Sequence, residues 1–252
     1  AVNENGLAMA GLLFPKSAFY PPPSQGGQPL APYELIPYLL GQCASVWEAR
    51  ELLGGLTLAA LPFSDALPLS PLHWMMTDGR ECLVIESTGA GLKLYDDPAG
   101  VLTNEPPFPG QLAHLSAYLH LTAGPPEDRL FGGRLGLTPI SRGMGAIGLP
   151  GDFSSPSRFV RAAFLRETSA PTCGQAESIA QFFRIMAGVS LPKGCVREAD
   201  GSAVYTQYTC CMDLSRSSYT FSTYADPALR TVSLTSADPE GDSLLRLPVT
   251  CG

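Results

Sequence analysis

The sequence predicts an α+β fold in which strands and helices form separate layers. Strand-like runs lie between residues 7 and 103 and again between residues 203 and 247, and two amphipathic helical patterns occupy residues 155–189 between them. Strands, two central helices and strands again is the order typical of an α+β layered protein. With 252 residues, 45% hydrophobic and 15% charged, the chain can also bury a substantial core.

The chain opens on a turn signal. Asn3-Glu-Asn-Gly6 is followed by the apolar run Leu7–Phe14, which predicts a hairpin whose second strand is buried. Only Ala1 and Val2 precede the turn, whereas a strand usually has about five residues. We therefore expect the sequence to be truncated at its N-terminus.

Two loops and a helix follow. Residues 15–32 contain three consecutive prolines and predict a long surface loop, and residues 33–42 form a short aromatic and aliphatic segment. Ser45-Val-Trp-Glu48 is a capping box that begins a helix, and Gly54-Gly55 ends it. The apolar loop 61–71 either lines a hydrophobic pocket or packs against the core. Its candidate pocket residues are Leu61, Phe63, Leu67 and Leu69.

The middle of the chain predicts an antiparallel meander and then a helix. The expected strands are Leu72–Met76, Cys82–Glu86, Leu92–Tyr95 and Val101–Thr103. Gln111–Leu121 has leucines at helical spacing, and residues 125–139 predict an irregular loop. Residues 143–148 fit G-x-G-x-x-G but open no helix, because Leu-Pro-Gly follows, so a dinucleotide site is rejected.

The first central helix is expected to begin at Ser155, which would cap it, with Pro156 at the first helical position. Its apolar face comprises Phe159, Val160, Ala163 and Phe164, and Arg161 and Arg166 are expected in water. Arg158 lies in the first turn, where the helix dipole mildly disfavours a cation. It either pairs with Asp152 on the surface or belongs to a site.

The second central helix is predicted over residues 176–189, with Ile179, Phe182, Phe183 and Met186 inward. Strands are then expected at 203–214, 219–224, 231–234 and 244–247.

Composition argues against several partners. A net charge of −7 without basic clusters disfavours nucleic acid and anionic membranes, and no apolar run reaches the roughly 18 residues of a membrane span. Seven scattered cysteines without C-x-x-C spacing suit reduced thiols and a cytoplasmic setting. Three distant histidines offer little for a metal, so neither metal nor cofactor is expected.

Five motifs occur in the order seen in a known family. Residues 149–161 read Leu-Pro-Gly-Asp-Phe-Ser-Ser-Pro-Ser-Arg-Phe-Val-Arg, and the others are Asn3–Gly11, Leu72-His-Trp, Val101-Leu-Thr-Asn-Glu-Pro-Pro-Phe and Tyr208-Thr-Cys-Cys. Together they resemble the choloylglycine hydrolase family, the bile salt hydrolases and penicillin V acylases of the N-terminal-nucleophile hydrolase superfamily. The resemblance implies a four-layer αββα sandwich, here lacking its opening strands, a single domain over residues 1–252, no cofactor and a homotetramer.

The resemblance also implies the chemistry. In this family an N-terminal cysteine supplies the thiolate and, through its α-amino group, the general base. Ala1 cannot do this, and the segment that would carry the cysteine with its companion arginine and aspartate is absent, so we expect the 252-residue chain by itself to be inactive and either insoluble or oligomeric. By resemblance Asn104 supplies an oxyanion-hole donor, Arg158 keeps the site electropositive, and Leu13 supplies a backbone N–H to the oxyanion.

Three functions remain open at this point. The first is hydrolysis of the amide between a bile acid and glycine or taurine, the second is penicillin V acylase activity, and the third is an inactive fragment that binds amphipathic ligands. The apolar loop 61–71 favours the first, because it could line the broad apolar surface that a steroid needs. Leu13 also favours the first, because the resemblance implies a tyrosine at this position in most penicillin V acylases.

Overall fold

A computed structural model describes residues 1–23, 29–234 and 246. Its contacts divide the chain into a first unit, residues 1–108 with 191–252, and a second unit, residues 109–190. The second unit is therefore inserted into the sequence of the first. The single-domain organisation stays a prediction.

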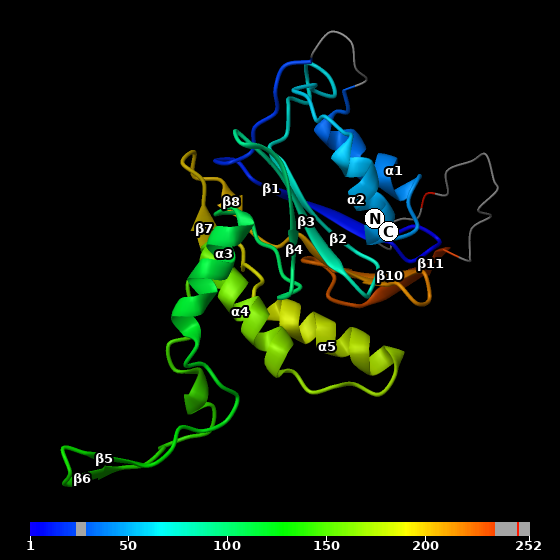
Figure 1. Ribbon diagram of the computed structural model, residues 1–252. Helices are drawn as coiled ribbons and strands as arrows, with labels where there is room; N and C mark the ends of the chain where they lie inside the picture. The colour runs from blue at the N-terminus through cyan, green and yellow to red at the C-terminus, as the bar shows by residue number, and fades with distance from the viewer. Residues whose placement is uncertain (24–28, 235–245, 247–252) are drawn as a thin grey trace. The chain divides into compact units, whose positions relative to one another are not determined.

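A four-stranded antiparallel sheet organises the first unit (Figure 1). Its strands are β1 (Ala8–Leu13), β2 (Leu72–Thr77), β3 (Cys82–Thr88) and β4 (Gly91–Asp96), in the order β1-β2-β3-β4. The turn before β1 forms as predicted, because the Gly6 N–H donates to the Asn3 carbonyl and the Asn3 N–H to the Leu7 carbonyl. The expected strand 101–103 does not form, so β4 ends the sheet.

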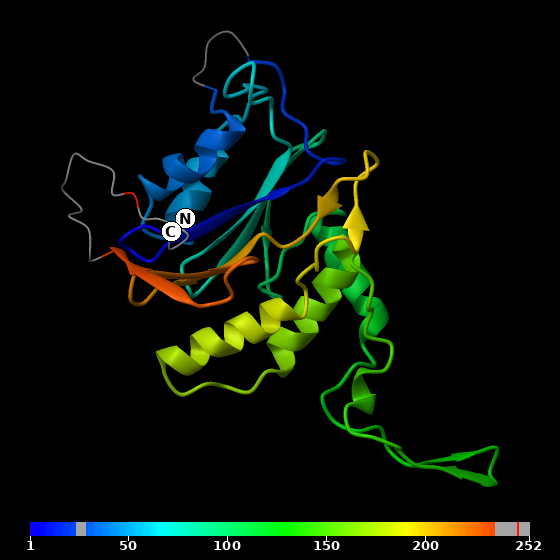
Figure 2. The same ribbon diagram turned by 180° about the vertical axis from the view of Figure 1, so that it is seen from behind.

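Two helices pack against one face of this sheet (Figures 1 and 2). They are α1 (Leu35–Leu40), preceded by a 3-10 turn over Pro32–Glu34, and α2 (Val46–Gly54). Trp74 and Met76 of β2 are fully buried in one cluster with Leu35, Leu39 and Val46 of the helices. The Ser45 hydroxyl accepts the Glu48 N–H at 3.2 Å, which confirms the predicted cap. Helix α1 was not predicted, because its sequence contains Pro37. Pro37 lies in the first turn, where a missing N–H is tolerated.

The remaining strands of the first unit come from its C-terminal part. A three-stranded sheet has the order β11-β10-β9, with β9 at Tyr208–Asp213, β10 at Ser218–Thr223 and β11 at Arg230–Ser233. A short hairpin pairs β7 (Val196–Arg197) with β8 (Ala203–Val204). The predicted strand 203–214 is thus two strands, interrupted at residues 205–207. The predicted strand 244–247 lies outside the described residues except for Arg246.

The second unit contains most of the helices. They are α3 (Phe108–Leu115), which begins at the last residue of the first unit, α4 (Ser155–Thr168) and α5 (Gln175–Ala187), with 3-10 turns at Ser116–Tyr118 and Met144–Ala146. The helix expected over 111–121 is therefore shorter and starts earlier. The loop expected over 125–139 contains a hairpin of β5 (Arg129–Phe131) and β6 (Leu135–Leu137). Gly132 and Gly133 both have positive φ, which allows the tight turn between its strands.

The N-cap of helix α4 lies one residue earlier than the sequence predicted. Ser154, not Ser155, has extended backbone angles, and its hydroxyl accepts the Ser157 N–H at 3.4 Å. Pro156 is then the second helical residue rather than the first. Both neighbouring serines can cap, so only the backbone conformation distinguishes them.

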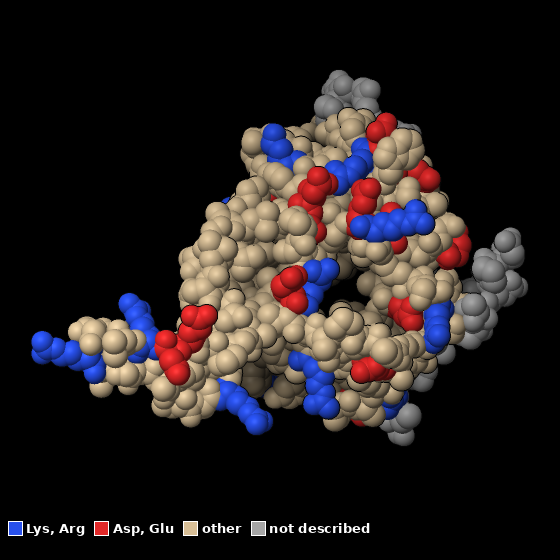
Figure 3. Space-filling view, turned by 60° about the horizontal axis from the view of Figure 1, so that its bottom comes forward, with Lys and Arg blue, Asp and Glu red and all other residues tan. Residues whose placement is uncertain are grey.

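Two surface properties bear on possible partners. Of the helices in the described ranges, none is both long enough and apolar enough to cross a membrane. Acidic and basic side chains are interspersed on the face shown in Figure 3.

Candidate active site

Strand β1 is an edge strand, and its last residue, Leu13, presents backbone groups at that edge. Leu13 lies opposite Leu72 of β2, and the next N–H, that of Phe14, donates to the Pro71 carbonyl at 2.9 Å. Because backbone groups alternate in direction along an antiparallel strand, the N–H and C=O of Leu13 point away from β2. The Leu13 side chain is 57% exposed.

Asn104 reaches this same edge from a segment without regular structure. Its side-chain nitrogen donates to the Leu13 carbonyl at 2.9 Å. Residues 101–103 were expected to form a strand, and that prediction is wrong because side-chain bonds, rather than a strand ladder, hold the segment beside β1. The structure therefore brings together two of the residues predicted for the site.

The pair has the donors that an oxyanion hole needs. Backbone N–H groups and asparagine amides stabilise the negative charge that develops on a carbonyl oxygen during acyl transfer. An asparagine amide carries two N–H groups, and the bond to Leu13 sets the plane in which both lie. The Leu13 N–H and the Asn104 amide are thus donors on the same side of one strand end.

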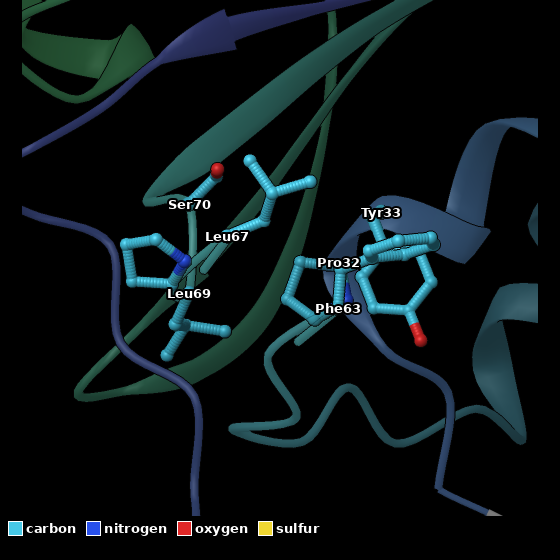
Figure 4. A pocket seen from close by; sticks show the side chains of 7 residues that line it. Pro32, Tyr33, Phe63, Leu67, Leu69 and Ser70 are labelled. Atoms are coloured by element: carbon cyan, nitrogen blue, oxygen red, sulfur yellow. The ribbon is translucent and has the colours of Figure 1, made fainter. Parts of the chain in front are cut away.

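An apolar pocket lies in the loop that precedes β2 (Figure 4). Its volume is about 290 Å³, and it is lined by Pro32, Tyr33, Phe63, Leu67, Pro68, Leu69 and Ser70. The Tyr33 and Phe63 rings meet edge to face with centroids 5.2 Å apart. Phe63, Leu67 and Leu69, three of the four residues predicted for a substrate pocket, are among these lining residues, and Leu61 is not. That a substrate occupies this pocket stays a prediction.

Chain continuity connects this pocket to the end of β1. Ser70 lines the pocket, the Pro71 carbonyl bonds to Phe14, and Leu72 lies opposite Leu13. Only Pro71, which precedes β2, and Leu72, the first residue of β2, therefore separate the pocket wall at Ser70 from the strand end that carries the candidate oxyanion donors.

Arg158 lies in the second unit, in the first turn of α4. Its Nε donates to the Phe153 carbonyl at 3.2 Å. Burial lowers the pKa of its guanidinium, and the nearby positive charge of Arg161 lowers it further. The Asp152 carboxylate, the expected surface partner, instead accepts from the Ser154 N–H and the Ser157 hydroxyl. A joint site of Arg158 with Asn104 stays a prediction.

Arg161 corrects an expectation. It was assigned to solvent, yet it is only 8% exposed. Its guanidinium donates to the carbonyls of Gly188, Pro150 and Asp152 at 3.0, 2.7 and 2.6 Å. A charged group can be buried when its donors are satisfied, and here it joins the start of α4 to the end of α5.

Metal ligands do not gather in the described part of the chain. Across residues 1–23, 29–234 and 246, no group of three or more histidine, cysteine, aspartate or glutamate side chains is placed to hold a metal ion.

Comparison with known families identifies the family of the chain. Residues 1–245 match the linear amide C–N hydrolases of the choloylglycine hydrolase family. The chain belongs to this family. The resemblance seen in the five motifs is thereby confirmed, as is membership of a class of amide-cleaving enzymes.

Two relatives of this chain carry the same name. A bile salt hydrolase/transferase of Lactiplantibacillus plantarum is 43% identical over 249 residues, covering 99% of this chain and 76% of the relative. A bile salt hydrolase/transferase of Clostridium perfringens is 33% identical, covering 96% of this chain and 74% of the relative.

Solved structures confirm the predicted fold class. A mutant of the conjugated bile acid hydrolase from Clostridium perfringens matches with a TM-score of 0.90 and 31% identity, over 99% of this chain and 77% of that one. The penicillin V acylase from Agrobacterium tumefaciens matches with a TM-score of 0.71 and 22% identity, over 93% of this chain and 65% of that one, which shows the fold alone. The chain thus has the α+β fold of the N-terminal-nucleophile hydrolases.

Sequence reasoning missed several residues around the candidate site. His73 and Glu86 are fully buried, with His73 Nδ1 3.1 Å from Glu86 Oε1, and His73 stacks on Phe14 at 4.2 Å between ring centroids. The same Glu86 oxygen accepts the Phe108 N–H at 2.9 Å. A glutamate within the apolar strand run 82–86 was the available signal. Glu105, beside Asn104, offered no comparable signal.

Proposed function

We propose that the gene product containing these residues is a bile salt hydrolase that cleaves the amide between a bile acid and glycine or taurine. The observation that carries the proposal is the contact between Asn104 and Leu13, 2.9 Å from amide nitrogen to carbonyl oxygen, at the strand end joined to an apolar pocket. The names of the relatives from Lactiplantibacillus plantarum and Clostridium perfringens support the choice of substrate.

The proposed reaction uses the N-terminal cysteine that the family resemblance implies, a role that Ala1 cannot take. The thiolate attacks the amide carbon, and the carbonyl oxygen becomes an oxyanion that accepts hydrogen bonds from the Leu13 N–H and the Asn104 amide. The cysteine α-amino group passes a proton to the leaving amine, which departs as glycine or taurine. Water then hydrolyses the thioester to release the bile acid. In this scheme Arg158 keeps the thiolate's surroundings electropositive.

The pocket suits a large apolar acyl group. Six of its seven lining residues carry apolar or aromatic side chains, and Ser70 is the exception. A steroid ring system would bury its surface against Phe63, Leu67 and Leu69, which supports a bile acid over a hydrophilic acyl group.

The test compares two amides that share the mechanism. We expect the gene product to release glycine from glycocholate with a kcat/KM at least about tenfold higher than its release of phenoxyacetate from penicillin V, a difference of about 1.4 kcal/mol. The reverse preference would make it a penicillin V acylase. Binding of glycocholate without release of glycine would favour an inactive binding protein.

We also propose that the protein is a homo-oligomer assembled through the β5–β6 hairpin. Its apolar side chains are exposed: Leu130 by 61%, Phe131 by 62%, Leu135 by 57% and Leu137 by 46%. A two-stranded hairpin is at best marginally stable alone, and exposed apolar patches mark interaction surfaces. The family resemblance, which implies a tetramer, supports a second copy of the chain as the partner.

A cytoplasmic location is part of the proposal. Its support is that the six described cysteines are thiols and not disulfides, as expected in a reducing compartment.

A further inference from the structure

The residue after Asn104 makes an unusual set of contacts. Glu105 Oε1 accepts the Lys16 N–H at 2.8 Å and the Ser17 N–H at 3.1 Å. Its other oxygen accepts the Ser17 hydroxyl at 2.8 Å. One carboxylate thus binds three donors of the turn that directly follows β1, and hydrogen bonds to an ionised acceptor are stronger than neutral ones.

These contacts bear directly on the oxyanion donors. Asn104 bonds to Leu13, and Glu105 bonds to Lys16 and Ser17, so two consecutive side chains hold one short stretch of chain, residues 13–17. A single hydrogen bond would let the segment pivot about it. Two attachments on adjacent residues fix both the distance and the orientation of the Asn104 amide relative to the Leu13 backbone.

The far end of the segment is also anchored. The Phe108 N–H donates to Glu86 Oε1 at 2.9 Å, and Glu86 is fully buried beside His73. Residues 104–108 form no strand ladder. Two carboxylates hold them instead: that of Glu105 near the start of the segment and that of Glu86 at its end. Glu86 lies inside the sheet, so its replacement would disturb the core, whereas Glu105 is half-buried and can be changed with less damage.

We propose that Glu105 is a positioning residue of the oxyanion hole, holding Asn104 and Leu13 at their working separation through the turn at Lys16 and Ser17. The proposal rests on the function proposed above. In this proposal Glu105 acts through the turn and not on a reacting atom. The competing view is that Glu105 only stabilises the turn, in which case activity would follow the folded fraction alone.

The kinetic test uses two Glu105 variants of the gene product and a matched control. Glu105→Ala should lower kcat about 10- to 100-fold with KM changed less than about twofold, since a small misplacement of a catalytic donor has effects of this size. Glu105→Gln keeps an oxygen for the two N–H donors and should recover most of the loss. Glu51→Ala, on the exposed face of α2, should match the wild type.

A double-mutant cycle separates positioning from folding. If Glu105 acts through Asn104, Glu105→Ala should cost less than about threefold in kcat once Asn104→Ala is present, because coupled residues are not additive. The same fold-loss in both backgrounds, or a wild-type kcat in the single variant, overturns the proposal.

Hydrogen exchange tests the attachment without any substrate. Peptides covering residues 14–20 and 101–108 should exchange faster in Glu105→Ala than in Glu105→Gln, with the rest of the protein unchanged. Unchanged exchange in these peptides overturns the proposal whatever the activity. A wild-type protein that hydrolyses neither glycocholate nor penicillin V contradicts the proposed function alone, because the exchange experiment still decides on the attachment.

Discussion

Asn104 has a structural contact and, in the function proposed here, a chemical role as well. It lies in a segment with no ladder bonds, and its contact with Leu13 spans 91 positions of sequence. Read alone, an asparagine before Glu-Pro is more typical of a turn. The contact with an edge-strand carbonyl is what makes it a candidate donor.

Replacing Asn104 should separate these two roles. We expect Asn104→Ala to lower kcat about 100- to 1000-fold, as loss of one oxyanion donor does elsewhere, while the free energy of unfolding falls by only about 1 kcal/mol. Steady-state kinetics and urea unfolding measure the two effects. Asn5→Ala, in the exposed turn before β1, is the control, and a wild-type rate in folded Asn104→Ala would leave Asn104 as a turn residue.

Asp152 predicts a pH dependence of stability. Its bonds from Ser154 and Ser157 hold the pKa of its carboxylate well below the usual range. The unfolded chain therefore binds this proton at a higher pH than the folded chain does. The stabilisation is complete above the unfolded value of about 3.9 and is lost as pH falls through the lower folded value.

The corresponding variant is Asp152→Asn. We expect it to be less stable than the wild type at pH 7 and to lose less stability between pH 7 and pH 3, measured by urea unfolding at both values. Asp128→Asn, an exposed residue of the same unit, should behave as the wild type does. An equal loss in Asp152→Asn and the wild type would contradict the assignment.

At the scale of elements, loop 61–71 and the turn at Pro32 act together. The loop contains no helix or named strand and the turn is a single 3-10 turn over Pro32–Glu34, yet their side chains form one pocket. Helix α4 of the second unit illustrates the same dependence on context, because its cap falls on Ser154 although Ser155 has the same side chain.

Phe63 should contribute to substrate binding through this pocket. We expect Phe63→Ala to raise KM for glycocholate about tenfold, because losing aromatic contact surface costs on the order of 1.5 kcal/mol. The matched control is Leu61→Ala, two residues earlier in the same loop and outside the pocket. A KM that rises for Leu61→Ala but not for Phe63→Ala would place the acyl group elsewhere.

At the scale of the whole molecule, the β5–β6 hairpin stands out because its apolar side chains are exposed in a single chain. Phe131 and Leu135 lie opposite each other in the hairpin, and both are more than half exposed. Burial of such a pair against another chain would remove apolar surface from water.

We therefore expect substitutions in the hairpin to change the oligomeric state. Phe131→Asp combined with Leu135→Asp should reduce the mass found by light scattering to that of one chain. Leu119→Asp, at an 88% exposed leucine of the same unit, should leave the assembly intact. If the double variant keeps the wild-type mass, the interface lies on another surface.

The sequence by itself determined the family, through five motifs in the family's order. It also determined the α+β class, the strands β1 to β4, helix α2 and the positions of α4 and α5, because these depend on local periodicity, caps and turns. It also pointed to Leu13 and Asn104, which the fold brings into contact, and to Phe63, Leu67 and Leu69, which line one cavity, while their roles toward a substrate stay predictions. Tertiary structure decided the conformation of segment 101–108 and the burial of Arg161, which local sequence patterns do not predict. The segment 101–108 is held by the side chains of Asn104, Glu105 and Glu86 and not by a ladder, and the Arg161 cation is buried because three distant carbonyls accept its bonds. Each outcome depends on partners brought together only by folding, and their contact energies outweigh the local preferences of the residues involved.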